Sequence, residues 1–107
     1  MKRITLVTSI ALGLTLLSTG SVLAADGAEL YKTKTCVACH GKDAKTPMMP
    51  LYPKIAGQNK EYAKQQMLDI KSGERANGQT AAMKGIMHLV SDEEIETLAD
   101  YLSSLAP

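Results

Sequence analysis

The chain has only two cysteines, Cys36 and Cys39, and His40 follows the second one directly. Two thiols at this spacing with an adjoining imidazole are typical of covalent c-type haem attachment. Both thiols can bond to the two vinyl groups along one edge of the porphyrin, and the imidazole then lies beneath the iron as an axial ligand. The sequence therefore predicts one haem c, attached through Cys36 and Cys39, with His40 as the proximal iron ligand.

The ligand on the opposite face of the iron has to come from a later part of the chain. Four methionines and one histidine that follow the motif are the candidates, namely Met48, Met49, Met83, Met87 and His88. The first two follow so closely that a proline-rich loop would have to wrap tightly around the haem edge. We favour Met83, because the glycine at position 85 lets the backbone pass close to the haem. Met87 and His88 remain open: Met87 also suits core packing, and His88 would give a bis-histidine haem of lower potential.

A different chemistry is open to the same residues. Cys36 and Cys39 could form a redox disulfide, or could bind zinc together with His40 and His88. An adjacent cysteine and histidine are awkward for tetrahedral coordination, and no second paired ligand motif follows. Haem attachment is therefore the favoured interpretation.

Residues 1–24 have the pattern of a signal peptide. Two basic residues at positions 2 and 3 precede an uncharged, mostly apolar run over residues 4–17, and a small-residue cleavage signal ends at Ala24. The apolar run is shorter than the roughly 20 residues that a membrane span needs. We expect cleavage after Ala24, a domain over residues 25–107, and no stable membrane insertion afterwards. Retention of an uncleaved anchor is the alternative.

Composition is consistent with a small domain built around a cofactor. The chain has no tryptophan, no phenylalanine and four tyrosines, and a domain of this size has a marginal core of its own. A covalent haem would supply the apolar volume that the core lacks, and its bonds to the chain would stabilise the small domain. The formal net charge of +1 gives no reason to expect nucleic-acid binding. The lysines between Lys32 and Lys84 either steer acidic partners or form an ordinary solvated surface.

Capping residues and apolar periodicity predict helices, and no strand pattern occurs. Asp26 is expected to cap a short helix that runs to about residue 35. A second helix is expected from Asn59 to Gly73, with a buried stripe formed by Ala63, Met67 and Ile70. Residues 41–57 are expected to form an irregular loop, and the short apolar run over residues 81–90 fits neither helix nor strand clearly.

The last helix is the best specified. Ser91 and Glu94 form a capping box at its start. Its apolar stripe consists of Ile95, Leu98, Ala99, Leu102 and Leu105. The chain is therefore predicted to be all-α.

Together these residues resemble the class I cytochrome c family, and in particular one half of the periplasmic dihaem cytochromes c. Besides the attachment motif, residues 50–58 resemble the family's loop on the proximal side. The resemblance implies that the carbonyl of Pro53 in this loop accepts a hydrogen bond from the second ring nitrogen of His40, which orients the ring. It also implies that Met83, eight positions before Ser91, is the distal ligand.

The same resemblance implies a small class I cytochrome c-like fold of three to five helices wrapped around one covalent haem. Gly27 and Tyr31 resemble the family's first helix where it crosses the last, at Leu98 and Tyr101. Because the chain has one attachment motif, it is expected to be a single-haem version of its two-haem relatives.

The expected function is one-electron transfer between redox protein partners in the bacterial periplasm, without enzyme activity of its own. Protein ligands on both faces of the iron would leave no site for a substrate. One alternative is the haem subunit of a larger oxidoreductase complex, such as a flavoprotein sulfide dehydrogenase. Another is a ligand-binding sensor, if Met83 is displaceable or absent from the iron.

Overall fold

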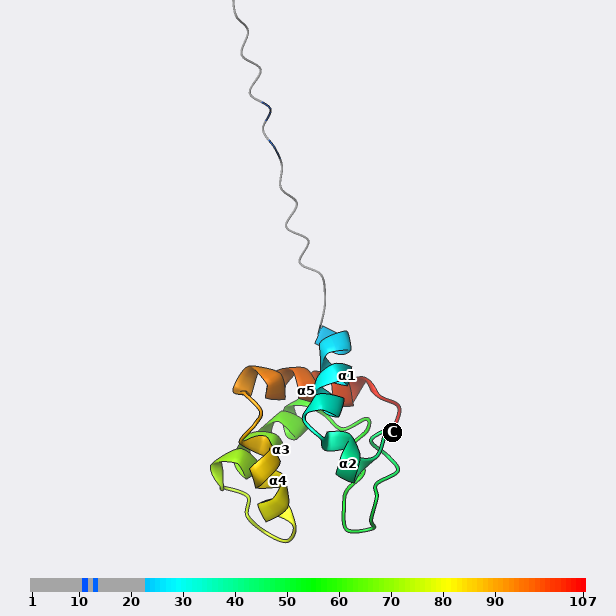
Figure 1. Ribbon diagram of the computed structural model, residues 1–107, viewed down its shortest axis with the longest axis vertical. Helices are drawn as coiled ribbons and strands as arrows, with labels where there is room; N and C mark the ends of the chain where they lie inside the picture. Colours follow the sequence, from blue (N-terminus) through cyan, green and yellow to red (C-terminus); the bar gives the residue numbers. More distant parts are fainter. Residues whose placement is uncertain (1–10, 12, 14–22) are drawn as a thin grey trace, which may run out of the picture.

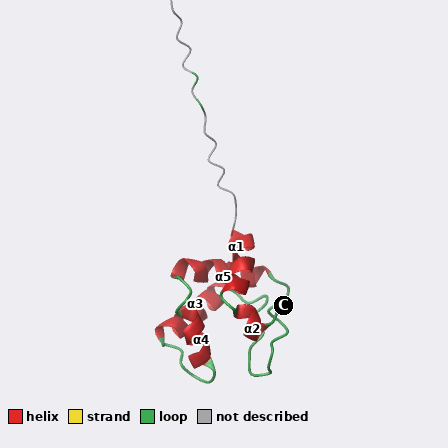
Figure 2. Cartoon of the chain, in the orientation of Figure 1, coloured by secondary structure: helices red, strands yellow, loops and turns green. Residues whose placement is uncertain are grey.

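The computed structural model describes Ala11, Gly13 and residues 23–107. Five helices occur in this part of the chain: α1 (Leu23–Thr33), α2 (Cys36–His40), α3 (Lys60–Ser72), α4 (Thr80–Met87) and α5 (Asp92–Ser104). Figure 2 shows these helices joined by loops, and none of the described residues lies in a strand. The predicted all-α fold of three to five helices is therefore confirmed.

The predicted signal peptide, residues 1–24, lies outside the described residues except for positions 11, 13, 23 and 24. Among the residues that the structure describes, no helix has the length and apolar character that a membrane crossing requires.

The first helix begins earlier than its sequence pattern predicts. Asp26 lies inside the first turn of α1, which starts at Leu23, so the prediction that Asp26 caps this helix is wrong. The two residues before Asp26 are alanines, the strongest helix formers, and they extend the helix toward the N-terminus. An acidic side chain in this first turn still stabilises the helix through its dipole.

The caps of α3 and α5 are those that the sequence predicts. The Asn59 side chain accepts a hydrogen bond from the Tyr62 backbone N–H, at 3.0 Å, and Gly73 ends α3 with a φ of 93°. At the start of α5, the Ser91 hydroxyl accepts from the Glu94 N–H at 3.1 Å, and the Glu94 carboxylate accepts from the Ser91 N–H at 3.0 Å. The Glu94 carboxylate therefore has a pKa below its ordinary value, mainly because of this N–H and further because of the nearby Lys34 ammonium.

The core is formed where α1 and α3 pack against α5, and α4 joins it by packing against α3. The predicted stripes of α3 and α5 are buried, apart from Leu105, which is partly buried. The run over residues 81–90 forms most of α4 and contributes Met87 and Val90 to the core. Among the described residues, the largest fully buried side chains are Ile70, Ile95, Leu98 and Val90.

Helices α1 and α5 cross in the core (Figure 1), and Gly27 lies at the crossing. A Cβ atom placed on Gly27 would collide with the Cβ of Tyr101 and would lie 3.1 Å from the Thr97 carbonyl oxygen. Next to this contact the rings of Tyr31 and Tyr101 pack at a centroid distance of 5.8 Å, tilted by 51°. The absence of a side chain at Gly27 therefore sets the distance between the two helices.

Tyr31 also connects this crossing to the residue that follows the attachment motif. Its side chain is buried, and its hydroxyl donates a hydrogen bond to the carbonyl of Gly41 at 2.5 Å. Burial raises the pKa of the Tyr31 phenol well above its ordinary value, so the hydroxyl keeps its proton and remains a donor. The position of α1 is thereby coupled to the end of α2.

A Gly27→Ala variant should be less stable by about 1–3 kcal/mol, because the new methyl group forces α1 and α5 apart. Denaturant unfolding monitored by circular dichroism measures the change. Glu29→Ala, on an exposed position of the same helix, is the control and should lose little stability. Equal stability of the Gly27→Ala variant and the parent would contradict the packing role assigned to Gly27.

A Tyr31→Phe variant should lose about 1 kcal/mol, because it removes one buried hydrogen bond and keeps the ring packing. The Gly41 carbonyl retains its longer bond from the Ala44 N–H, 3.3 Å, which limits the loss. Tyr62→Phe makes the same chemical change at an exposed side chain and should be neutral. A loss as large in Tyr62→Phe as in Tyr31→Phe would rule out the Gly41 contact as the cause.

Candidate haem site

The attachment motif forms a helix of its own, a feature that the sequence pattern did not predict. α2 spans only five residues and is bounded by two positions of positive φ, Thr35 at 63° and Gly41 at 86°. Positive φ is uncommon for a residue other than glycine, so Thr35 makes a sharp turn between α1 and α2. Because Cys36 and Cys39 are three positions apart in a helix, their side chains lie on the same face. No disulfide joins the two sulfur atoms, and both side chains are partly buried.

His40, the last residue of α2, is held in one orientation. Its side chain is 7% exposed, and Nδ1 donates a hydrogen bond to the Pro53 carbonyl oxygen at 2.9 Å. For Nδ1 to donate, it has to carry the ring proton, and Nε2 is then the nitrogen with a free lone pair. A buried imidazole with one nitrogen fixed in this way is the usual arrangement of a metal ligand.

The loop after α2 brings Pro53 to the histidine by folding back on the helix. The Asp43 carboxylate accepts hydrogen bonds from the backbone N–H groups of Lys45 and Thr46, at 3.0 and 2.8 Å. These bonds lower the pKa of Asp43. Further along, the Met48 N–H donates to the Cys39 carbonyl at 3.1 Å.

The buried Ala44 organises the second half of the same loop. Its carbonyl accepts from the N–H groups of Ile55 and Ala56, at 2.8 and 3.0 Å. The backbone that follows Pro53 is thereby tied to the residues directly after α2.

The candidate distal ligands occupy three different environments. Met83 lies on α4 and is partly buried against the core, whereas Met87, one turn later, is 3% exposed and belongs to the core. His88 follows α4 and is exposed. Met48 and Met49 lie on the loop that carries Pro53 and are 72% and 45% exposed. Figure 1 shows α2 and α4 on opposite sides of the domain.

This donor set fits a covalent haem. Two thiols share one face of a helix, the next residue presents an imidazole with one fixed nitrogen, and a thioether is available on another element. The structure does not gather these residues into a zinc site: within the described residues, no three His, Cys, Asp or Glu side chains are placed to hold a metal ion. Burial also raises the pKa of the Cys36 thiol, whereas cysteines that exchange disulfides have lowered values.

Four of the lysines are neutralised by carboxylates of α5. The pairs are Lys34 with Glu94, Lys60 with Glu96 and Asp100, Lys64 with Glu96, and Lys71 with Asp92. The hydrogen bonds from Lys64 and Lys60 lower the pKa of Glu96. These lysines therefore belong to the helix packing, which the sequence pattern did not reveal. Lysines 42, 45 and 54, on the loop after the motif, have no such pair among the described residues.

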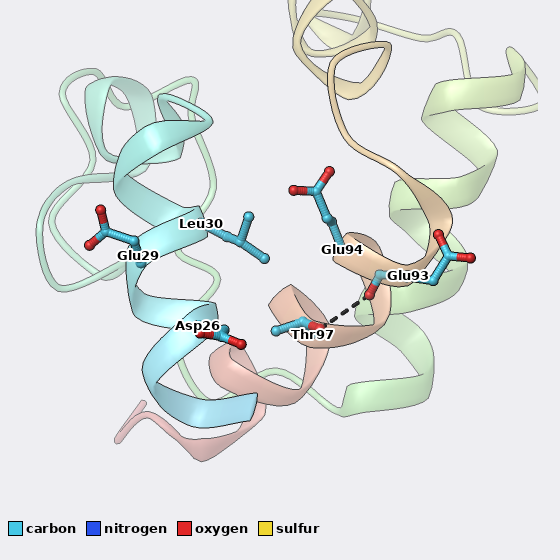
Figure 3. A pocket seen from close by; sticks show the side chains of 6 residues that line it. All are labelled: Asp26, Glu29, Leu30, Glu93, Glu94 and Thr97. Carbon is cyan, nitrogen blue, oxygen red and sulfur yellow. Dashed lines mark hydrogen bonds between the residues drawn. The ribbon is translucent and has the colours of Figure 1, made fainter. Parts of the chain in front are cut away.

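A separate hollow lies between α1 and α5 (Figure 3). It is lined by Asp26, Glu29, Leu30, Glu93, Glu94 and Thr97. The Thr97 hydroxyl donates to the Glu93 carbonyl at 3.2 Å. The lining of this hollow contains no cysteine, histidine or methionine, so the hollow is distinct from the candidate haem site.

Comparison with known proteins assigns the chain to a family. The family model described as Cytochrome c matches residues 24–106. Cytochrome c4 of Stutzerimonas stutzeri is 39% identical over an alignment of 103 positions that covers 89% of this chain and 49% of that protein. Cytochrome c-553 of Nitratidesulfovibrio vulgaris (strain Miyazaki F) is 35% identical over 105 residues, 98% of this chain and 100% of that protein.

A solved structure agrees with this assignment. The crystal structure of reduced recombinant cytochrome c4 from Pseudomonas stutzeri matches with a TM-score of 0.71 at 29% identity, over 79% of this chain and 49% of that one. The chain thus spans about half the length of the cytochromes c4 that it matches, as expected for a single-haem version of one half of a dihaem cytochrome. The chain belongs to the cytochrome c family, with the class I fold and a covalently bound haem c.

Proposed function

We propose that this chain is a periplasmic electron carrier, whose haem is attached through Cys36 and Cys39 and whose iron is ligated by His40 and Met83. The observation that carries the proposal is the 2.9 Å hydrogen bond from His40 Nδ1 to the Pro53 carbonyl. It fixes a buried imidazole, next to two thiols on one helix face, with Nε2 free to bind. Haem iron held between two protein ligands supplies a reversible one-electron change and leaves no open position for a substrate.

The chain's own residues limit structural change at the site. The His40 ring is fixed by Pro53, and the loop that carries Pro53 is in turn held by Ala44 and by the Asp43 turn. Tyr31 holds the backbone directly after His40. Because these contacts do not depend on the charge of the iron, they favour the same geometry in both oxidation states, which is what fast electron transfer requires.

Met83 is the proposed distal ligand because of its environment on α4. It is partly buried at the margin of the core, whereas the side chain of Met87 is already used in core packing. The exposed His88 follows the helix, and Met48 is on the loop that supports the proximal histidine. A thioether opposite an imidazole raises the reduction potential relative to a bis-histidine haem.

Export supports the periplasmic location. The signal-peptide pattern of residues 1–24 is expected to direct the chain out of the cytoplasm, and the proposed partners are other redox proteins. A partner can approach the exposed lysines of the loop after the attachment motif, residues 42, 45 and 54, and an acidic partner would be steered by them.

Mature protein from a host that attaches haem should begin at Ala25 and carry one haem bonded through two thioethers. Intact mass spectrometry and the visible spectrum check this together. Cys36→Ala and Cys39→Ala should each leave a single thioether and shift the spectrum, because one vinyl group stays unreacted. Secreted parent protein with the mass of the bare polypeptide would refute covalent attachment.

Met83→Leu should abolish the weak far-red absorption band of the oxidised protein and lower the reduction potential, because the thioether ligand is removed while a side chain of similar volume is kept. Spectroscopy and a redox titration measure both. Met87→Leu is the matched control and should retain the band, with at most a modest loss of stability.

Met83→Leu and Met87→Leu also test whether Met87 or His88 is the distal ligand instead. Loss of the band in Met87→Leu alone would assign the ligand to Met87. A parent protein without the band, and a His88→Ala variant with altered ligation, would assign it to His88.

A further inference from the structure

Two lysines from different parts of the chain hold the backbone between α4 and α5. Lys34 Nζ donates to the carbonyl oxygen of Leu89 at 2.9 Å, and Lys71 Nζ donates to the carbonyl oxygen of Val90 at 2.6 Å. Lys34 lies in the turn just before Cys36, and Lys71 lies in the last turn of α3. We call these two lysines and the two carbonyl groups the lysine clamp.

Each lysine of the clamp also contacts a carboxylate in the first turn of α5. Lys34 Nζ lies 3.6 Å from the Glu94 carboxylate, and Lys71 Nζ lies 3.0 Å from that of Asp92. The side chains of the two lysines are 26% and 27% exposed, against 36% and 37% for Lys60 and Lys64, which bind only carboxylates. Hydrogen bonds from a charged donor are stronger than neutral ones, so the clamp is more than a pair of surface ion pairs.

The clamped segment is continuous with the helix that carries the proposed distal ligand. The Leu89 N–H donates to the Ile86 carbonyl at 2.9 Å, and the Val90 N–H donates to that of Met87 at 3.1 Å. Among the described helices, α4 packs against α3 alone. The bond from Lys34 is therefore a direct link between the end of α4 and the side of the domain that carries the attachment motif.

We infer that Lys34 and Lys71 are positioning residues for the distal ligand: they hold the end of α4 in place and thereby oppose release of the ligand from the iron. The inference rests on the proposed function in one respect, because it takes the distal ligand from α4 or from the residue directly after it. It concerns how firmly that ligand is held, and not which residue it is.

Imidazole binding to the oxidised holoprotein tests the inference, because imidazole can reach the iron only after the distal ligand has left. Lys34→Leu and Lys71→Leu should each bind imidazole about tenfold more tightly than the parent, since each loses one charged hydrogen bond that disfavours the open state. Amide hydrogen exchange within α4 should be faster in both variants. Lys34→Arg should restore parental behaviour, because a guanidinium also reaches the carbonyl and the carboxylate.

Matched controls separate the clamp from general destabilisation and from charge. Lys64→Leu removes an α3–α5 ion pair without touching the clamp and should leave imidazole affinity unchanged. Glu94→Gln keeps the capping box and the Leu89 carbonyl but removes the charge partner of Lys34, and it should have a smaller effect than Lys34→Leu.

The Met83→Leu background distinguishes failure of this inference from failure of the proposed ligand. If Met83→Leu loses the far-red band, then adding Lys34→Leu should not alter imidazole affinity further, because no ligand remains to be displaced. A band that survives in Met83→Leu would overturn the ligand assignment alone, and the single lysine variants would still report on the clamp. Parental imidazole affinity in both single lysine variants, or an equal increase in Lys64→Leu, would overturn the clamp.

Discussion

The hydrogen bond between His40 Nδ1 and the Pro53 carbonyl is the constraint around which the site is arranged. A buried imidazole free to rotate would present either nitrogen, or neither, to a metal. With Nδ1 engaged at 2.9 Å, only Nε2 is available and the plane of the ring is fixed. Much of the surrounding structure serves this one contact. The positive φ values at Thr35 and Gly41 set the ends of α2, and the loop anchored on Ala44 delivers the carbonyl.

The haem-bearing helix depends in turn on contacts made far from it. α2 is too short to be stable on its own, so its position has to come from neighbours. Tyr31 supplies one contact by donating to Gly41, and its ring packs on Tyr101 of α5. Because Gly27 has no side chain, α1 and α5 can approach closely enough for this ring pair to form. A small residue on α1 thus influences the geometry of a histidine on a different helix.

Much of this architecture can be predicted from the sequence, because it depends on local interactions. The caps at Asn59, Gly73 and Ser91 and the stripes of α3 and α5 follow from hydrogen bonds and periodicity within one element. The attachment motif is predictable for the same reason, since its chemistry is confined to five consecutive residues.

The features that the sequence did not reveal depend on the folded chain. α2 is bounded by a left-handed threonine rather than by a recognisable cap, and the start of α1 extends through alanines before the expected cap. The lysine contacts join residues far apart in sequence, such as Lys34 and Leu89. Long, flexible side chains leave no periodic signal of where they will bind, so such contacts become visible only in three dimensions.

The crossing of α1 and α5 has a consequence for how the domain folds. Its two helices come from opposite ends of the domain, so forming this contact closes nearly the whole chain into a loop, with the corresponding entropic cost. Contacts of such large sequence separation slow folding relative to helical proteins whose contacts are local. The core therefore cannot be completed until α5 has been synthesised, and before that point α1, which holds the end of α2 through Tyr31, has no α5 to pack against.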